Sequence, residues 1–361
     1  MTIGKTGAAR LRFVSLAALL AAGFVVSTVE GSAAAGGGST SRVVGLDVSF
    51  PQCGERLPSG QAFAVVGVTG GRASTPNPCL GPHPGLARSE LAWARFTSSG
   101  LGGVAKVALY TNTGDPGNVY DGVAVANWPI SGQTPYGGCA RTVVMLDGVP
   151  SAVGENSRAC AWEYGFQRAG CAFRRAAAAT EAVNDRLARR GLSFRVPLPG
   201  SAVWWLDVET ANTWLSGSLG TAMNVADVEG MLAGFRYQGV DTVGVYSAAS
   251  QWEAITGGAD LGPATPDWIA GSLTRHEAAG FCGTTGFSGG PVLLSQYTPD
   301  GVVEGLDYDV ACAVGAPSAP PGGGTVVTTS VVAPRLTSFE FAKSLVSELR
   351  RSFLGKALLP G

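Results

Sequence analysis

The stretch WWLDVE, residues 204–209, places two acidic residues at the end of a short apolar run. A run of this length, rich in aromatic and branched residues, is typical of a β-strand covered on both faces. Side chains two positions apart on a strand point to the same side, so Asp207 and Glu209 should project together at or just beyond the strand's end. In a β/α barrel that end carries the active site, which makes both carboxyl groups candidate catalytic residues.

Seven further apolar runs resemble this one, so the sequence predicts eight strands. Helical patterns lie at residues 85–98, 159–190 and 225–237, and they become short or absent after the fifth strand. Residues 112–158 lack periodicity and are expected to form a long loop. The expected fold is therefore α/β, an irregular eight-stranded β/α (TIM-like) barrel that is poor in helices in its second half. The expected strands span residues 43–49, 64–69, 104–111, 203–208, 242–247, 267–271, 292–296 and 306–310.

The two ends of the chain differ in composition from its centre. Residues 1–35 hold three basic residues ahead of the apolar run 13–26, followed by small residues, which is typical of a secretory signal peptide. Residues 313–334 are expected to form a Pro/Gly-rich linker and residues 335–361 an amphipathic tail. Residues 36–312 are close in number to the ~250 of one large barrel domain. We therefore expect a secreted protein, extracellular or associated with the cell envelope, with no transmembrane segment in the mature chain.

The charge of the chain argues against one class of partner. Between residues 36 and 312 there are 17 basic and 23 acidic residues. Phosphate binding requires clustered Lys and Arg, so no nucleic-acid partner is expected. The tail is basic and carries large apolar residues at steps of four, which fits contact with an anionic envelope surface. Packing of this stripe against the chain's own barrel, or partial disorder of the tail, is the interpretation that we prefer.

Seven cysteines in a chain with a secretory signal predict disulfides, and one cysteine must stay unpaired. Cys160 and Cys171 fall in one expected helix, where 11 positions separate them by ~16 Å, beyond the reach of a disulfide. No Cys or His spacing suggests zinc. The sequence leaves the other pairings open. The arrangement that we prefer is Cys53–Cys79, Cys139–Cys160 and Cys282–Cys312, with Cys171 free.

Two other expected strands bring acidic residues to the same region. Asp47 lies on the first strand, and Asp307 and Asp309 lie on the last, which becomes its neighbour when a barrel closes. Carboxylates ~6.6 Å apart at an effective dielectric of ~20 repel each other by about 2.5 kcal/mol, which corresponds to roughly two pKa units. One group should therefore keep its proton beside an ionised partner. Cleavage of a glycosidic bond needs this combination.

Other readings of these residues stay open. An Asp-x-Glu at a strand end can cap a helix or pair with an Arg, and an oxygen-rich cluster can hold Ca²⁺ or Mg²⁺. His83 and His276 are the only histidines and neither is near the acidic motifs, so we expect no metal and no cofactor. Aromatic and polar side chains beside the strands are candidates for sugar binding, although about half of such aromatic residues should be core. The candidates are Asn112, Trp205, Tyr246, Trp268, Gln296 and Asp309.

Five motifs occur in an order that resembles glycoside hydrolase family 25, the lysozyme-like muramidases. The resemblance is closer still to exported actinobacterial glycoside-hydrolase-like domains of unknown function. It implies that Glu209 is the general acid, that Asp207 assists the acetamido group, and that Asp47 and Asp307 are the first-strand and last-strand acids. The implied reaction is hydrolysis of the bond after N-acetylmuramic acid, without a metal. The motifs are GLDVSFPQ (45–52), WWLDVE (204–209), GVYS (244–247), DWIAGS (267–272) and SQYTPDGVVEGLDYDV (295–310).

Two strand ends depart from the muramidase pattern. The second strand reads VVGVTGGR (65–72), without the Lys and the Glu-Gly that the muramidases usually carry there. The third ends in YTNT (110–113), where the muramidases favour Tyr-His-Phe. The sequence therefore predicts a glycosidase acting on cell-wall polysaccharide, peptidoglycan or a related envelope glycan. A non-catalytic carbohydrate-binding barrel is the alternative.

Overall fold

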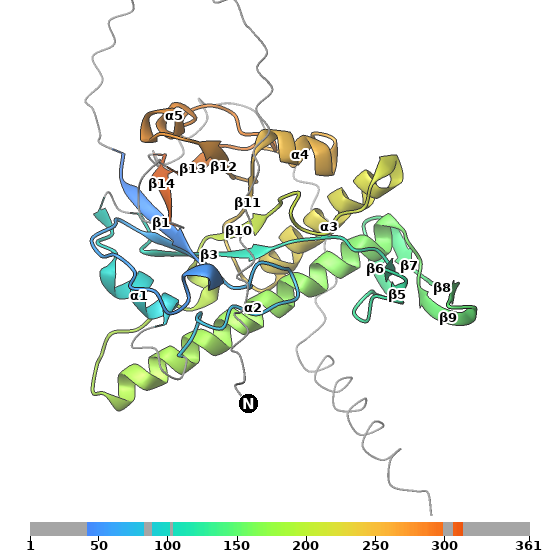
Figure 1. Ribbon diagram of the computed structural model, residues 1–361, viewed down its shortest axis with the longest axis horizontal. Helices are drawn as coiled ribbons and strands as arrows, with labels where there is room; N and C mark the ends of the chain where they lie inside the picture. The colour runs from blue at the N-terminus through green and yellow to red at the C-terminus, as the bar shows by residue number, and fades with distance from the viewer. Residues whose placement is uncertain (1–41, 83–88, 102–103, 299–305, 313–361) are drawn as a thin grey trace, which may run out of the picture. The chain divides into compact units, whose positions relative to one another are not determined.

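A closed barrel of eight strands forms the centre of the molecule (Figure 1). The computed structural model describes residues 42–82, 89–101, 104–298 and 306–312. The predicted signal peptide, linker and tail lie outside these residues. The barrel strands are β1 (Val44–Val48), β2 (Ala64–Gly67), β3 (Val107–Asn112), β10 (Trp204–Asp207), β11 (Val243–Ser247), β12 (Asp267–Ser272), β13 (Val292–Tyr297) and β14 (Asp307–Ala311).

Each barrel strand overlaps one of the eight predicted runs, and the predicted fold class is confirmed. The strands follow the order β1-β14-β13-β12-β11-β10-β3-β2 around the barrel. All neighbours are parallel except that β14 runs antiparallel to both β1 and β13. As a result, the first residue of β14 lies at the end of the barrel where the other strands finish. This end is called the C-terminal end of the barrel below.

Five helices lie in the described part of the chain, and the later ones are short. They are α1 (Glu90–Thr97), α2 (Arg158–Arg189), α3 (Gly217–Tyr237), α4 (Ala249–Thr256) and α5 (Arg275–Gly280). Helix α3 begins eight positions before the predicted start, because the Asn224 side chain bonds both backbone groups of Leu215 and holds a first turn that contains weak helix formers. No helix of the described residues combines the length and apolar composition needed to cross a bilayer.

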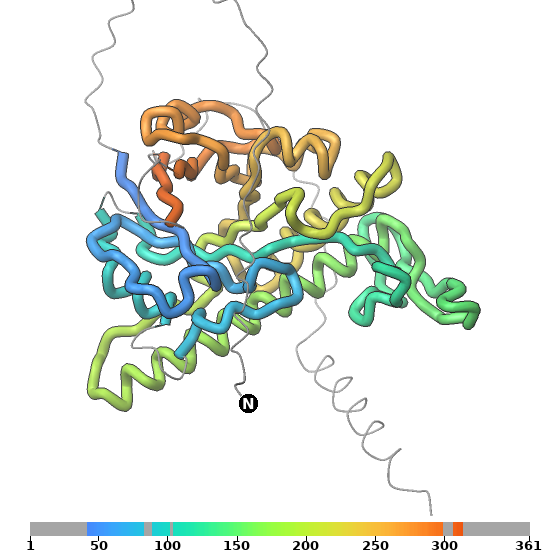
Figure 2. Tube along the Cα trace, in the orientation of Figure 1, coloured from blue at the N-terminus to red at the C-terminus, as the bar shows by residue number. Residues whose placement is uncertain are grey.

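The predicted loop over residues 112–158 contains three small antiparallel hairpins instead. They are β4 (Val119–Tyr120) with β5 (Val123–Ala124), β6 (Gly132–Thr134) with β7 (Gly137–Cys139), and β8 (Arg141–Leu146) with β9 (Val149–Gly154). Strands β4 to β7 are too short to show a period. Strands β8 and β9 have six residues each and join at Asp147 and Gly148, a hairpin turn that the sequence analysis missed. In Figures 1 and 2 this region extends away from the barrel beside the start of α2.

Three disulfides hold the connections, and the preferred pairing is confirmed. Cys53 bonds Cys79, Cys139 bonds Cys160, and Cys282 bonds Cys312. Cys171 is free and half-buried on α2. The third disulfide joins the segment after α5 to the end of β14, so it ties the antiparallel closing strand to the rest of the barrel.

Strand β10 shows how the apolar run divides between two cores. Trp204 faces outward and packs on Phe235 of α3, with ring centroids 4.4 Å apart. Trp205 faces inward and meets Trp268 of β12 at 5.8 Å between centroids. The alternation continues to Asp207, which therefore points into the barrel above Trp205.

Helices α2 and α3 approach closely where glycines leave out side chains. A Cβ added at Gly230 would lie 2.0 Å from the carbonyl oxygen of Trp162, and one added at Gly165 would lie 2.0 Å from that of Asp227. Neither backbone atom can move without shifting a helix. The close packing of the two helices therefore requires glycine at both positions.

Gly230→Ala is expected to destabilise the protein by about 1–3 kcal/mol, even though alanine favours a helix more than glycine does. Chemical unfolding monitored by circular dichroism would measure the loss. Gly280→Ala is the matched control, since no atom lies within 4 Å of the added Cβ there. Equal stability of the two variants would contradict the close helix contact.

Candidate functional site

Acidic side chains from three strands gather at the C-terminal end of the barrel. Asp207 is the last residue of β10, and Glu209 follows two positions later. Asp47 on β1 pairs in register with Asp307, the first residue of the antiparallel β14. The mutual electrostatic effects of these carboxyl groups show that they share one region. The convergence inferred from the sequence is therefore present in the structure.

Asp207 and Glu209 form a closely spaced carboxyl pair in which each group shifts the pKa of the other. Burial raises the pKa of Asp207 well above its usual value, and the negative charge of Glu209 raises it further. The pKa of Glu209 is also raised, mainly by burial, although hydrogen bonds with Asp207 and Gln251 act in the opposite direction. Asp207 is 4% exposed whereas Glu209 is half-buried. Both groups therefore keep their protons to a higher pH than ordinary carboxyl groups do, and Glu209 is the more accessible of the two.

Two polar side chains from neighbouring strands hold Asp207 in place. The Asn112 side-chain amide, at the end of β3, donates to the Asp207 carboxyl group. The Thr69 hydroxyl donates to Asn112 Oδ1 at 2.9 Å, which orients the amide with its nitrogen toward Asp207. Strand β3 is the neighbour of β10, and Asn112 lies directly beside Asp207 in the register.

Asp47 and Asp309 form a second carboxyl pair on the other side of the barrel. Burial, followed by the charge of Asp307, raises the pKa of Asp47 to about 8. Burial, followed by the charge of Asp47, raises the pKa of Asp309 well above its usual value. Gln296 Nε2 donates to Asp47 Oδ2 at 3.0 Å, and Trp268 Nε1 donates to Asp309 Oδ1 at 2.8 Å.

No Lys or Arg side chain contributes to the pKa of any carboxyl group in these two pairs, as far as the described residues show. A structural ion-pair network would have lowered these pKa values instead. Proton retention by burial and by like charge is the arrangement found at acid–base sites.

Two curated proteins are similar to part of this chain. Over 106 residues the chain is 37% identical to "Probable GH family 25 lysozyme 2" of Dictyostelium discoideum. The aligned region is 29% of this chain and 47% of that protein. The chain is 35% identical over 105 residues to "Probable GH family 25 lysozyme 4" of the same organism, which is covered to 46% of its length. The chain resembles the family 25 lysozymes. It spans about half the length of these curated relatives, and no family model matches it.

Solved structures align with most of the chain at low similarity. The muramidase from Trichobolus zukalii covers 74% of this chain with 93% of its own, at 14% identity and a TM-score of 0.36. The lysozyme from Streptomyces coelicolor covers 76% with 93% of its own, at 17% identity and a TM-score of 0.37. The fold class is established by the barrel topology itself and not by these alignments.

Three of the predicted sugar-binding residues lie deeper in the barrel than the carboxyl groups, where a sugar cannot reach them. Trp205, Trp268 and Asp309 are 1%, 2% and 0% exposed. A sugar could contact them only if the barrel rearranged. We therefore assign the two tryptophans to packing of the barrel centre, and Asp309 to the pair with Asp47. The sequence could not separate these roles, because strand alternation predicts which side of the strand a side chain faces but not how deeply it is buried.

The other three candidates lie around the carboxyl groups. Asn112 and Gln296 are engaged with Asp207 and Asp47, as described above. The hydroxyl of Tyr246 donates to Gln296 Oε1 at 2.8 Å, and this side chain is half-buried. Tyr246 remains the aromatic candidate for contact with substrate.

Two residues around the site were missed by the sequence analysis. Gln251 on α4 bonds Glu209, and its Oε1 accepts from both the backbone and the hydroxyl of Thr210. No sequence signal indicates this contact, since the two segments meet only in the folded barrel. Tyr110 lies two positions before Asn112 and packs on Trp268 at 6.2 Å between centroids. The spacing of two on a strand could have identified Tyr110.

The described residues contain no group of three or more His, Cys, Asp or Glu that could hold a metal ion. His276 is the second residue of the short helix α5, and His83 lies outside the described residues.

A second set of buried acidic residues lies between the loop after β3 and the helices α2 and α3. Burial raises the pKa of Asp115 to about 7 and raises that of Asp227 well above its usual value. Gly117 N donates to Asp115 Oδ1 at 2.9 Å, but Asp115 Oδ2 and both Asp227 oxygens have no hydrogen-bond partner. These groups affect stability, as the Discussion argues.

Proposed function

We propose that this chain is a secreted glycosidase that hydrolyses cell-wall glycan, with Glu209 as the acid. One observation carries the proposal: Asp207 and Glu209 lie close together at the C-terminal end of the barrel, and both have raised pKa values. Similarity to proteins named as family 25 lysozymes supports peptidoglycan or a related envelope polysaccharide as the substrate. Three disulfides support an oxidising, extracellular location.

In the proposed reaction, Glu209 protonates the oxygen of the glycosidic bond while that bond breaks. Positive charge develops on the sugar ring that remains. The Glu209 carboxylate then accepts a hydrogen bond from Asp207, whose more strongly raised pKa lets it keep its own proton. The single negative charge on the pair stabilises the cationic ring. A water molecule then forms the new bond to the ring carbon, and its proton returns to the Glu209 carboxylate. This role for Asp207 differs from assistance to an acetamido group, which the family resemblance implies.

Asp47 and Asp307 complete the acidic site on the opposite side. Asp307 is half-buried at the end of β14, and its charge is one reason why the pKa of Asp47 is raised. We assign these two residues to hydrogen bonding with sugar hydroxyl groups and to stabilisation of positive charge in the transition state.

Incubation of residues 36–361 with purified peptidoglycan tests the proposal. All barrel strands lie between Val44 and Ala311, so removal of the first 35 residues leaves the fold complete. We expect new reducing ends, and mass spectrometry of the fragments should show N-acetylmuramic acid at those ends. Binding to the polymer without any release, across several envelope glycans, would instead support the non-catalytic sugar-binding barrel.

A further inference from the structure

The loops that enter β3 and β10 meet at the N-terminal end of the barrel, opposite the acidic site. Both strands are parallel neighbours, so the segments that precede them lie side by side. Arg95 Nε donates to the carbonyl oxygen of Arg195 at 3.0 Å, which joins the end of α1 to the loop before β10. The rings of Phe96 and Phe194 meet edge to face, with centroids 6.0 Å apart.

Large apolar side chains are exposed where these segments meet. Phe96 is 38% exposed, Phe194 59% and Leu198 71%. Leu192 lies two positions before Phe194, after the end of α2, and is 41% exposed. Single exposed apolar residues are ordinary, but a group of neighbouring ones marks a surface that binds something apolar.

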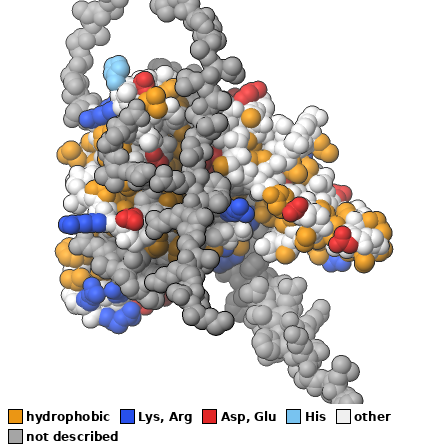
Figure 3. All heavy atoms as spheres, viewed as in Figure 1, with side chains coloured by type: hydrophobic (Ala, Val, Ile, Leu, Met, Phe, Trp, Pro, Cys, Tyr) orange, Lys and Arg blue, Asp and Glu red, His pale blue; other side chains and the backbone are white. Residues whose placement is uncertain are grey.

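The same surface is strongly cationic, although the barrel domain as a whole is acidic. Residues 95–106 and 186–200 contain six of the 17 basic residues between 36 and 312 and no acidic residue, and the nearest acidic residues on α2 are Glu181 and Asp185. Figure 3 shows Lys and Arg side chains together at the lower left of the molecule, where Figure 1 places the C-terminal end of α2. The six are Arg95, Lys106, Arg186, Arg189, Arg190 and Arg195. We call the four apolar and six basic side chains the basal patch.

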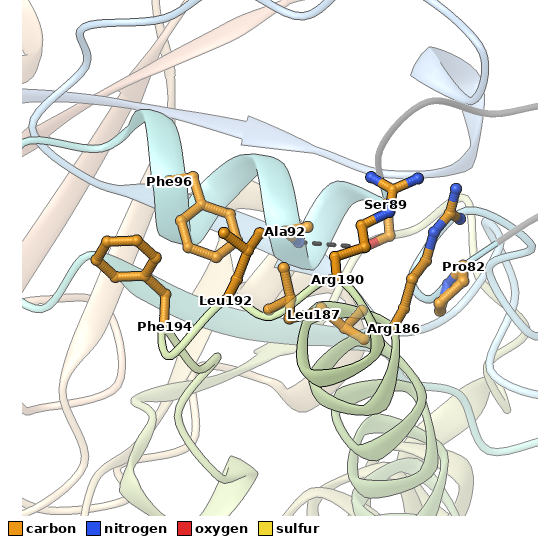
Figure 4. A pocket seen from close by; sticks show the side chains of 10 residues that line it. Pro82, Ser89, Ala92, Phe96, Arg186, Leu187, Arg190, Leu192 and Phe194 are labelled. Carbon is orange, nitrogen blue, oxygen red and sulfur yellow. Dashed lines mark hydrogen bonds between the residues drawn. The ribbon is translucent and has the colours of Figure 1, made fainter.

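A hollow of about 340 Å³ opens in the basal patch between α1 and the end of α2. Its two ends differ in character (Figure 4). Phe96, Leu192 and Phe194 form the apolar end, whereas Arg186 and Arg190 extend along the other end. A second hollow of about 340 Å³ adjoins this one and has Arg95 and Lys106 among mainly apolar walls. Each hollow thus combines space for an apolar chain with cations for a negative group.

We propose that the basal patch binds an anionic lipid surface. Arginines alone would fit any polyanion, but exposed Phe194 and Leu198 gain nothing from a fully hydrophilic polymer. Acyl chains bury such side chains while phosphate head groups meet the arginines. Bound in this way, the protein directs its acidic end away from the membrane. The inference stands on this surface alone and does not require the proposed hydrolase activity.

Vesicle co-sedimentation tests the proposal with residues 36–361, using phosphatidylcholine with and without phosphatidylglycerol. Each arginine near an anionic surface contributes roughly fivefold to binding. The triple variant Arg186→Gln, Arg189→Gln, Arg190→Gln should therefore bind phosphatidylglycerol vesicles roughly 100-fold more weakly. Its matched control, Arg56→Gln, Arg72→Gln, Arg141→Gln, removes three exposed arginines elsewhere and should retain binding within a few-fold after the same change in net charge.

A second pair of variants tests the apolar contribution. Phe194→Ser with Leu198→Ser should weaken binding at least roughly tenfold, whereas Val143→Ser with Met145→Ser on the exposed hairpin should not. Thermal unfolding checks that all variants are folded. Equal binding by patch and control variants would overturn the proposal, as would no preference for phosphatidylglycerol. Loss through the arginines with no effect of Phe194 and Leu198 would indicate a soluble polyanion instead of a lipid.

Discussion

Replacement of Glu209 by glutamine should lower kcat for peptidoglycan hydrolysis by about 10²–10⁴-fold, the usual contribution of a general acid. Glutamine has nearly the same shape but no proton to give to the leaving oxygen. The backbone carbonyl of Glu209 that accepts from Trp214 Nε1 is unchanged. The fold should therefore persist, and the loss should appear in kcat rather than in the affinity for glycan. Release of reducing ends under single-turnover conditions measures it directly.

Glu181→Gln is the matched control, because Glu181 is an exposed carboxyl group on α2, outside the carboxyl pairs. Its activity should equal that of the unaltered chain. If Glu209→Gln and Glu181→Gln both hydrolyse peptidoglycan at the original rate, the assignment of Glu209 fails. If only Glu209→Gln loses activity but its unfolding temperature also collapses, Asp207→Asn provides the second test at the same pair.

The free energy of unfolding should fall as pH rises from 5 to 8, by on the order of 5 kcal/mol, or roughly 10–20 °C in Tm. The pKa is raised by burial to about 8 for Asp47 and to about 7 for Glu90, Asp115 and Asp267. In the unfolded chain the same groups lose their protons near pH 4. Between these pH values the folded state holds more protons, so its advantage is complete at low pH and disappears as the folded groups ionise.

Thermal unfolding at several pH values between 5 and 8 would show this slope, and Asp115→Asn identifies one source of it. An asparagine keeps the oxygen that accepts from Gly117 N, and it removes the charge beside Asp227. Its stability should match the original near pH 5 and exceed it at pH 8. Stability that rises with pH, or an unchanged slope in Asp115→Asn, would contradict the assignment of raised pKa values to these buried groups.

Much of the barrel could be predicted because its signals are local. Each strand is a short apolar run, and a turn or a helix separates each run from the next in the sequence. Helix geometry excluded only the Cys160–Cys171 pairing and left the other disulfides open until the structure placed the cysteines. The β8–β9 hairpin also had a local signal, the turn residues Asp147 and Gly148 at positive φ, whereas strands β4 to β7 are too short to show a period.

For the candidate site, the sequence predicted which side chains face into the barrel but not how deeply each one is buried. Alternation along β10 correctly places Asp207 and Trp205 on one side of the strand. It does not tell that Trp205 lies beneath the carboxyl groups, nor that Asp309 pairs with Asp47. Depth depends on how the strands tilt and close, and that information is absent from any single run.

The sequence by itself determined which segments become strands and which of their side chains face the inside of the barrel. It also determined that three of the strands carry acidic residues near one end. These properties follow from the two-residue period of a strand, which is local. Only the tertiary structure decided where the protons reside. The pKa of each carboxyl group depends on its burial and on neighbours such as Gln296, which lies 249 positions from Asp47. The antiparallel entry of β14 likewise decided that Asp307 would join the others at one end of the barrel.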